Sequence, residues 1–139
     1  MPAKFENSTI TAESLNANPS ACFVYGDNIQ RQGLGGAAAL RHHPRAIGFI
    51  TKKAPDHLAK SSFKPEEYVK LFFDQLENLS TRIRSNPQQT YYISKLGAGL
   101  ANRYYIWETV IRHNLLDELA GFDNVVFCWP EKEEDFTSK

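Results

Sequence analysis

Residues 21–40 read ACFVYGDNIQRQGLGGAAAL, and this segment decides the fold class. Its first five residues are apolar and rich in strand formers, which predicts a buried strand that ends at the turn signal Gly26-Asp27-Asn28. The glycines of residues 33–36 lead into a run of alanines, which favours a helix over residues 37–41. A strand, a glycine-rich loop and a helix in succession are typical of a layered α/β protein.

Two longer helices are predicted further along the chain. One begins at Lys64-Pro65, where proline and the acidic residues after it suit a first turn, and it ends at Asn86-Pro87. Its apolar residues recur three and four positions apart, which gives the helix one apolar face. The second helix covers roughly residues 104–120, and Gly121 is placed to cap it.

Further strands are predicted over residues 46–51, 90–94 and 124–129, so strands and helices alternate. This order indicates an α/β fold with three α/β/α layers, in which a mostly parallel mixed sheet carries helices on both faces. Ligands of such proteins bind beyond the carboxyl ends of the strands. Two of the predicted strands end in glycine-rich loops, one after Tyr25 and one after Ser94.

The composition is that of one globular domain. The chain has 139 residues, of which 42% are hydrophobic and 23% charged, so we expect a single domain with its core at about residues 21–129. A polar N-terminal segment and an acidic C-terminal tail flank that core. No signal peptide or membrane-spanning run is visible, so we expect a cytoplasmic protein that does not engage membranes. Cys22 and Cys128 lie in apolar runs and are expected to be buried free thiols.

The charges are balanced in number but uneven in position. The formal net charge is +0, yet no carboxylate lies between Asp27 and Asp56, a stretch that contains five basic residues and two histidines. This pattern favours a site for a small anionic ligand over a general nucleic-acid interface. A solvated basic face is the alternative. The four histidines show no spacing typical of metal ligands, so no metal site is expected.

The first candidate site combines Asp27 and Asn28 with the glycines of residues 33–36. Glycines allow backbone N–H groups to approach a phosphate closely, and the start of a helix adds partial positive charge. The Asn28 amide can hydrogen-bond sugar hydroxyls, and the Asp27 carboxylate can accept a proton from water. The alternatives are an Asx turn followed by a simple strand-to-helix connection.

A loose dinucleotide fingerprint, Gly33-x-Gly35-x-x-Ala38, also occurs in this segment. Lys52 and Lys53 at the end of the next strand would suit a phosphorylated ribose, so NADP binding stays open.

The second candidate site is the segment from Ser94 to Arg103, another passage from a strand through glycines into a helix. Facing the first loop, it would hold the other side of a diphosphate. Tyr104 and Tyr105 follow it and are expected either to stack on a base or sugar or to belong to the core.

Together these motifs resemble the macro domain. The resemblance covers roughly residues 21–129 and is carried by the strand ending in Asn28, by the segment GLGGAA at residues 33–38 and by ISKLGAG at residues 93–99. It extends to a group of small bacterial and phage proteins with similar motifs. It implies an ADP-ribose site without a cofactor, in which Asn28 meets the distal ribose and residues 97–100 close over the diphosphate. No residue before Ala21 matches the acidic residue that contacts adenine in that family.

The resemblance therefore predicts a protein that binds ADP-ribose or an ADP-ribosylated macromolecule and hydrolyses an ADP-ribosyl bond, with Asn28 and Asp27 as catalytic residues. Some macro domains only bind, so a non-catalytic reader and a plain interaction protein are the alternatives. The expected ligand-binding residues are Gly26, Gly33, Leu34, Gly35, Gly36, Ala37, Thr51, Lys52, Lys95, Gly97, Ala98, Gly99, Leu100 and Arg103.

Overall fold

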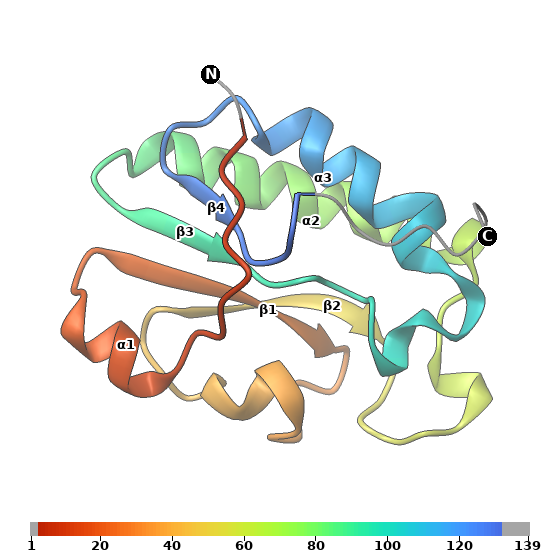
Figure 1. Ribbon diagram of the computed structural model, residues 1–139. Helices are drawn as coiled ribbons and strands as arrows, with labels where there is room; N and C mark the ends of the chain where they lie inside the picture. Colours follow the sequence, from red (N-terminus) through yellow and green to blue (C-terminus); the bar gives the residue numbers. More distant parts are fainter. Residues whose placement is uncertain (1–2, 132–139) are drawn as a thin grey trace.

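The computed structural model describes residues 3–131 and places four parallel strands in one sheet (Figure 1). The strand order is β2-β1-β3-β4, and the strands are β1 (Ala21–Asn28), β2 (Ala46–Lys52), β3 (Thr90–Ile93) and β4 (Val125–Phe127). The prediction of an α/β protein with a parallel sheet is confirmed. The prediction of a mixed sheet is wrong, because all pairings between the four strands are parallel. Within residues 3–131, the only antiparallel pairing is an isolated bridge between Lys52 and Ser62.

The central strand β1 is buried on both faces, as expected for a parallel strand covered by helices. Cys22 and Val24 point into the larger core beneath the long helices, whereas Phe23 and Tyr25 belong to a smaller core on the opposite face. The strand is longer than predicted, because pairing with β2 continues to Asn28, which lies opposite Lys52. Asp27 and Asn28 are therefore strand residues and not a turn.

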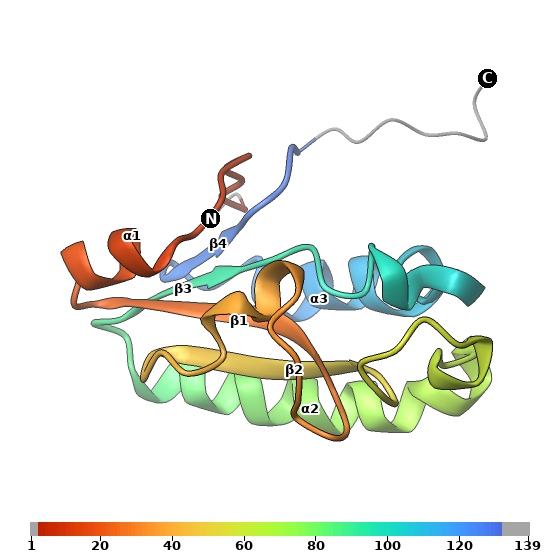
Figure 2. The same ribbon diagram turned by 90° about the horizontal axis from the view of Figure 1, so that it is seen from below.

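Helix α2 (Pro65–Ser85) confirms the predicted helix, with Pro65 and two glutamates in its first turn. Its buried face consists mainly of Tyr68, Phe72, Leu76, Leu79 and Ile83. The helix also covers the exposed edge of β2 (Figure 2). Gln75 exchanges two hydrogen bonds with the backbone of Ile50, at 2.7 and 3.1 Å, and the Tyr68 hydroxyl donates to the Ile50 carbonyl. An edge strand capped in this way has fewer free backbone groups for pairing with another chain.

The second long helix begins later than predicted. Residues Leu100–Tyr104 form a 3₁₀ turn, Tyr105 adopts a left-handed conformation with φ of 63°, and a π-helical turn over Trp107–Ile111 precedes α3 (Arg112–Leu119). The Asn102 side chain explains the late start, because its carbonyl accepts a hydrogen bond from the Trp107 amide at 2.9 Å. The predicted glycine cap is also wrong: α3 ends at Leu119, Ala120 is its C-cap residue, and Gly121 has no positive φ.

Within residues 3–131, the opposite face of the sheet carries only short helices, α1 (Ala12–Ala17) and a 3₁₀ helix over Gly36–Leu40. The α-helix predicted over residues 37–41 is thus a five-residue 3₁₀ helix. Arg45 ties α1 to the sheet, because its guanidinium donates to the carbonyls of Ala21 and Leu15. Helices therefore flank both faces, with the long pair on one side and the short pair on the other.

Both cysteines are free thiols, but only Cys22 is buried, since Cys128 is partly exposed. Burial, together with the nearby carboxylate of Glu6, raises the pKa of the Cys128 thiol to about 12. Within residues 3–131, no helix is long and apolar enough to cross a membrane. The predicted acidic tail lies almost entirely outside the described residues.

The loop after β3 depends on Gly97. Its φ is +74°, and an added Cβ would lie 2.6 Å from the Ile111 Cδ1 atom. We expect Gly97→Ala to lower the free energy of unfolding by about 1–3 kcal/mol, because it combines backbone strain with overpacking. Urea denaturation measures this change.

Gly35→Ala is the matched control. Gly35 has an extended backbone with φ of -78°, and an added Cβ would meet no heavy atom within 4 Å. Its free energy of unfolding should stay within about 0.5 kcal/mol of the wild type. Equal losses in the two variants would show that the loop does not need glycine at residue 97 in particular.

Candidate ligand-binding site

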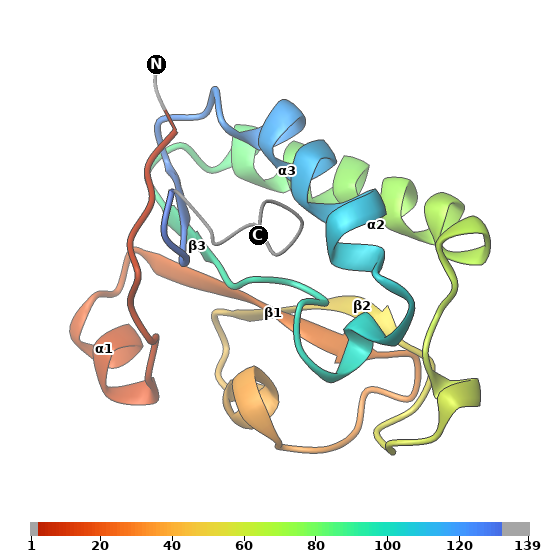
Figure 3. The ribbon, with the colours of Figure 1, turned by 45° about the vertical axis from the view of Figure 1, so that its right-hand side comes forward.

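A pocket of about 600 Å³ opens where β1 and β2 end and the loop after β3 begins. We call it the Asn28 pocket. It lies at the point where the connections leaving the central strands diverge, which is where parallel α/β sheets bind ligands. The two glycine-rich loops meet there, because a Cβ on Gly26 would lie 3.9 Å from the Gly97 backbone nitrogen. Figure 3 shows the loop after β3 beside the carboxyl end of β1.

Most of the residues expected at the ligand are brought together around this pocket. The residues of that set that line it are Gly26, Asp27, Asn28, Gly33, Gly35, Gly36, Thr51, Lys52, Lys95, Gly97, Gly99 and Leu100. Leu34, Ala98 and Arg103 are not in the described lining, and Arg103 instead donates to the His57 carbonyl at 3.2 Å. Ala37 lies in the short 3₁₀ helix.

The pocket is also lined by residues outside the expected ligand-binding set. Ala38, Ser94 and Ala101 belong to the two candidate segments, whereas Gln32, Pro55 and His57 were not expected at the ligand. Pro55 and His57 come from the irregular segment after β2. The only signal for them was position, since any segment that follows a parallel strand begins at the carboxyl edge of the sheet.

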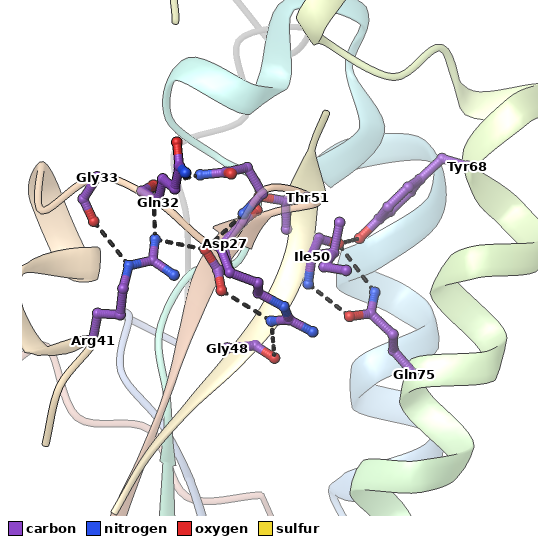
Figure 4. Close-up of polar contacts among 11 residues, drawn as sticks. Asp27, Gln32, Gly33, Arg41, Gly48, Ile50, Thr51, Tyr68 and Gln75 are labelled. Carbon is purple, nitrogen blue, oxygen red and sulfur yellow. Dashed lines mark hydrogen bonds and ion pairs between the residues drawn. The ribbon is translucent and has the colours of Figure 1, made fainter. Parts of the chain in front are cut away.

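Asp27 is held between two arginines (Figure 4). Its side chain is only 1% exposed, and its two oxygens lie 2.6 Å from Arg41 Nη2 and 2.9 Å from Arg31 Nη1. The Asn28 backbone amide donates to the same carboxylate at 2.8 Å. Arg31 adopts a left-handed backbone conformation with φ of 56° in the loop that brings it there. Both carboxylate oxygens are therefore occupied by protein donors.

These contacts fix the protonation state of Asp27. Burial by itself would raise the pKa of Asp27, but the hydrogen bonds from Arg41, Arg31 and the Asn28 amide outweigh burial and hold the pKa below its ordinary value. A carboxylate with a lowered pKa and no free oxygen is a weak general base. The geometry thus favours a positioning role for Asp27 over the expected catalytic one.

Arg41 connects Asp27 to the glycine loop. Besides the ion pair, its guanidinium donates to the carbonyls of Gln32 and Gly33, each at 2.9 Å, and lies 5.7 Å from the centre of the Tyr25 ring. A glycine is needed at residue 33, because φ is +95° there and a Cβ would lie 3.3 Å from Pro55. The loop is therefore held by Arg41 side-chain contacts and not by a long helix.

The basic side chains in the carboxylate-free stretch between Asp27 and Asp56 do not all lie at the pocket. Arg31 and Arg41 meet at Asp27, Arg45 holds α1, and Lys53 pairs with Glu67 at 3.0 Å. Lys52 lines the pocket while its amine donates to the Asp56 carbonyl. The phosphate site expected at the glycines of residues 33–36 therefore has a lysine beside it, but the five-residue helix that follows is too short to contribute much dipole.

Asn28 has one unused hydrogen-bonding atom. The residue is 7% exposed, and its Nδ2 donates to the Gln32 carbonyl at 2.8 Å. That bond fixes the orientation of the amide, so Oδ1 can only accept. Oδ1 is buried and accepts no hydrogen bond from residues 3–131. Since an unpaired buried acceptor costs about 1–3 kcal/mol, this atom is suited to a donor supplied by a ligand.

The aromatic residues after the second loop do not join the pocket. Neither Tyr104 nor Tyr105 is in its described lining or in the buried core. The Lys64 amine lies 5.8 Å from the Tyr104 ring centre, and Tyr105 is 66% exposed. Both expected roles, base stacking and core packing, are therefore unsupported. Among residues 3–131, no group of three or more His, Cys, Asp or Glu side chains is arranged to hold a metal ion.

The ion pairs of Asp27 should make the free energy of unfolding depend on pH in the acidic range. Because the pKa of Asp27 is lower in the folded state than the unfolded value of about 3.9, its contribution is fully present above that value. It is lost as pH falls through the folded pKa. We expect Asp27→Asn to be less stable than the wild type at pH 7, and we expect this difference to shrink as the pH is lowered below about 4.

Urea denaturation between pH 7 and pH 3 measures the effect. Asp74→Asn is the control, because it removes an exposed ion pair with Lys70 on α2 and should change stability by less than about 1 kcal/mol. A difference between wild type and Asp27→Asn that does not vary with pH would contradict the ionic role of Asp27.

Comparison with known proteins gives a family without an assigned function. Residues 5–102 match the model of a family of unknown function, DUF7831. The described lining of the Asn28 pocket falls inside this region. No curated protein and no solved structure matches the chain. Because the match spans more than half of its length, the chain belongs to the family of unknown function DUF7831.

Proposed function

We propose that the Asn28 pocket binds ADP-ribose, free or attached to a macromolecule. The observation that carries this proposal is the unpaired Oδ1 atom of Asn28, buried at the end of the central strand. Its amide is oriented by Gln32, so the ligand group that meets it must be a donor. A ribose hydroxyl is such a donor, as the resemblance to macro domains implies for the distal ribose.

The charge around the pocket supports an anionic ligand. Asp27 is the one carboxylate in the described lining, and two arginines neutralise it. Lys52 and Lys95 line the same pocket, so its described lining contains two lysines beside the neutralised carboxylate. A diphosphate suits this environment, because positively charged clefts concentrate anions. The volume of about 600 Å³ is in the range of sites for small ligands and cofactors.

Binding is better supported than hydrolysis. The predicted general base, Asp27, has both oxygens engaged by arginines and the backbone. Hydrolysis of an ADP-ribosyl bond stays a prediction, and it would depend on Asn28 to hold the water or the ribose. NADP is less favoured, because only Lys52 of the two expected lysines lines the pocket while Lys53 pairs with Glu67.

Calorimetric titration with ADP-ribose, NADP and AMP tests the proposal. We expect micromolar binding of ADP-ribose and weaker binding of the other two. Asn28→Ala should weaken ADP-ribose binding about tenfold or more, because it removes the buried acceptor and the hydrogen bond that orients it. Ligand recovered intact after long incubation would indicate a reader, and released ribose or nucleotide would indicate a hydrolase.

Asn114→Ala is the matched control. Its amide also donates to a backbone carbonyl, that of Val110 at 2.7 Å, but it lies on α3 outside the pocket. Its affinity for ADP-ribose should equal that of the wild type. The proposed function would be refuted if none of the three ligands bound the wild type, or if the wild type and Asn28→Ala bound ADP-ribose with equal affinity.

A further inference from the structure

A second cavity of about 450 Å³ lies on the face of the sheet that carries the short helices. We call it the Phe23 cavity. Its walls come from the segment of residues 8–12, from β1, from the 3₁₀ helix and from the ends of β3 and β4. Figure 3 shows α1 and the 3₁₀ helix on either side of this region. The lining residues that matter below are Ile10, Phe23, Ala39, Leu40, Ser8 and Thr9.

The Phe23 cavity adjoins the Asn28 pocket. Gly36 and Ser94 line both. Gly36 has no side chain, and a Cβ added there would meet no heavy atom within 4 Å. A ligand that extends past Gly36 would reach both spaces.

The two spaces differ in chemistry. The described lining of the Asn28 pocket includes Lys52 and Lys95, whereas that of the Phe23 cavity contains no charged side chain. Ile10, Phe23 and Leu40 give the cavity apolar walls, and Ser8 and Thr9 add hydroxyls. An uncharged, flat group with a polar edge fits such a lining. Nucleobases have these properties, with apolar faces and hydrogen-bonding edges.

We infer that the Phe23 cavity receives the nucleobase of the ligand whose phosphates and distal ribose occupy the Asn28 pocket. This inference rests on the proposed function, and it assigns the nucleobase half of the ligand, for which the sequence offered only Tyr104 and Tyr105. The described lining has no carboxylate, so neutral hydroxyls face the edge of the base.

The variant Ala39→Phe tests the assignment. Ala39 is exposed, lines the Phe23 cavity and is absent from the lining of the Asn28 pocket, so a large side chain there obstructs one space only. The dissociation constant for ADP-ribose should rise tenfold or more without a fall in melting temperature. Ala17→Phe, at an exposed position of α1 outside both linings, should leave it unchanged. An unchanged constant in folded Ala39→Phe overturns the inference.

Nuclear Overhauser contacts locate the base directly in the wild type. Protons of adenine should contact the methyl groups of Ile10 and Leu40. Contacts to Leu100 alone, which lines the Asn28 pocket, would overturn the inference while leaving ADP-ribose binding intact. Failure of the wild type to bind ADP-ribose would remove the proposed function and the inference with it.

Discussion

The buried carboxylate of Asp27 is the constraint on which the carboxyl edge of this sheet depends. A charge taken out of water at the end of a central strand is costly unless it is paired and hydrogen-bonded. Arg31 and Arg41 supply that pairing, at 2.9 and 2.6 Å. The neighbouring strand must leave room for it, because a Cβ on Gly48 would lie 2.5 Å from the Asp27 carboxylate. One ion cluster thus restricts the loop after β1 and a glycine in β2.

The same cluster arranges the candidate site. The Arg41 guanidinium donates a hydrogen bond to the backbone carbonyl of Gln32, and the side-chain amide of Asn28 donates to the same carbonyl. Among residues 3–131 nothing pairs with the remaining acceptor, Oδ1 of Asn28, a residue that lines the Asn28 pocket. In the proposed binding site, the paired charges of Asp27, Arg31 and Arg41 would position the loop, and the Asn28 amide would contact the ligand. This division explains why two adjacent residues with similar side chains have different expected roles.

The uneven covering of the sheet has a functional consequence. The long helices α2 and α3 fill one face with the larger apolar core. In the described part of the chain, residues 3–131, the opposite face has only α1 and a five-residue 3₁₀ helix, and residues of both line the Phe23 cavity. Short helices cover less area than long ones. This face therefore has space for the proposed nucleobase, next to the point where the connections leaving the central strands diverge.

The sequence by itself determined the α/β class, the parallel arrangement, the extent of α2 and the two glycine-rich loops. These features follow from local periodicity, from proline and glycine positions and from apolar runs, all of which are read within one segment. It did not determine that β1 continues through Asn28 or that the second long helix starts after Tyr105. Both boundaries depend on partners elsewhere in the chain, Lys52 in one case and the side chain of Asn102 in the other. Only the tertiary structure brought Arg31 and Arg41, but not Arg45, to Asp27, and so changed Asp27 from an expected base into a paired anion. The physical reason is that a pKa and a hydrogen-bond vacancy are properties of an environment, which exists only after distant segments have packed together.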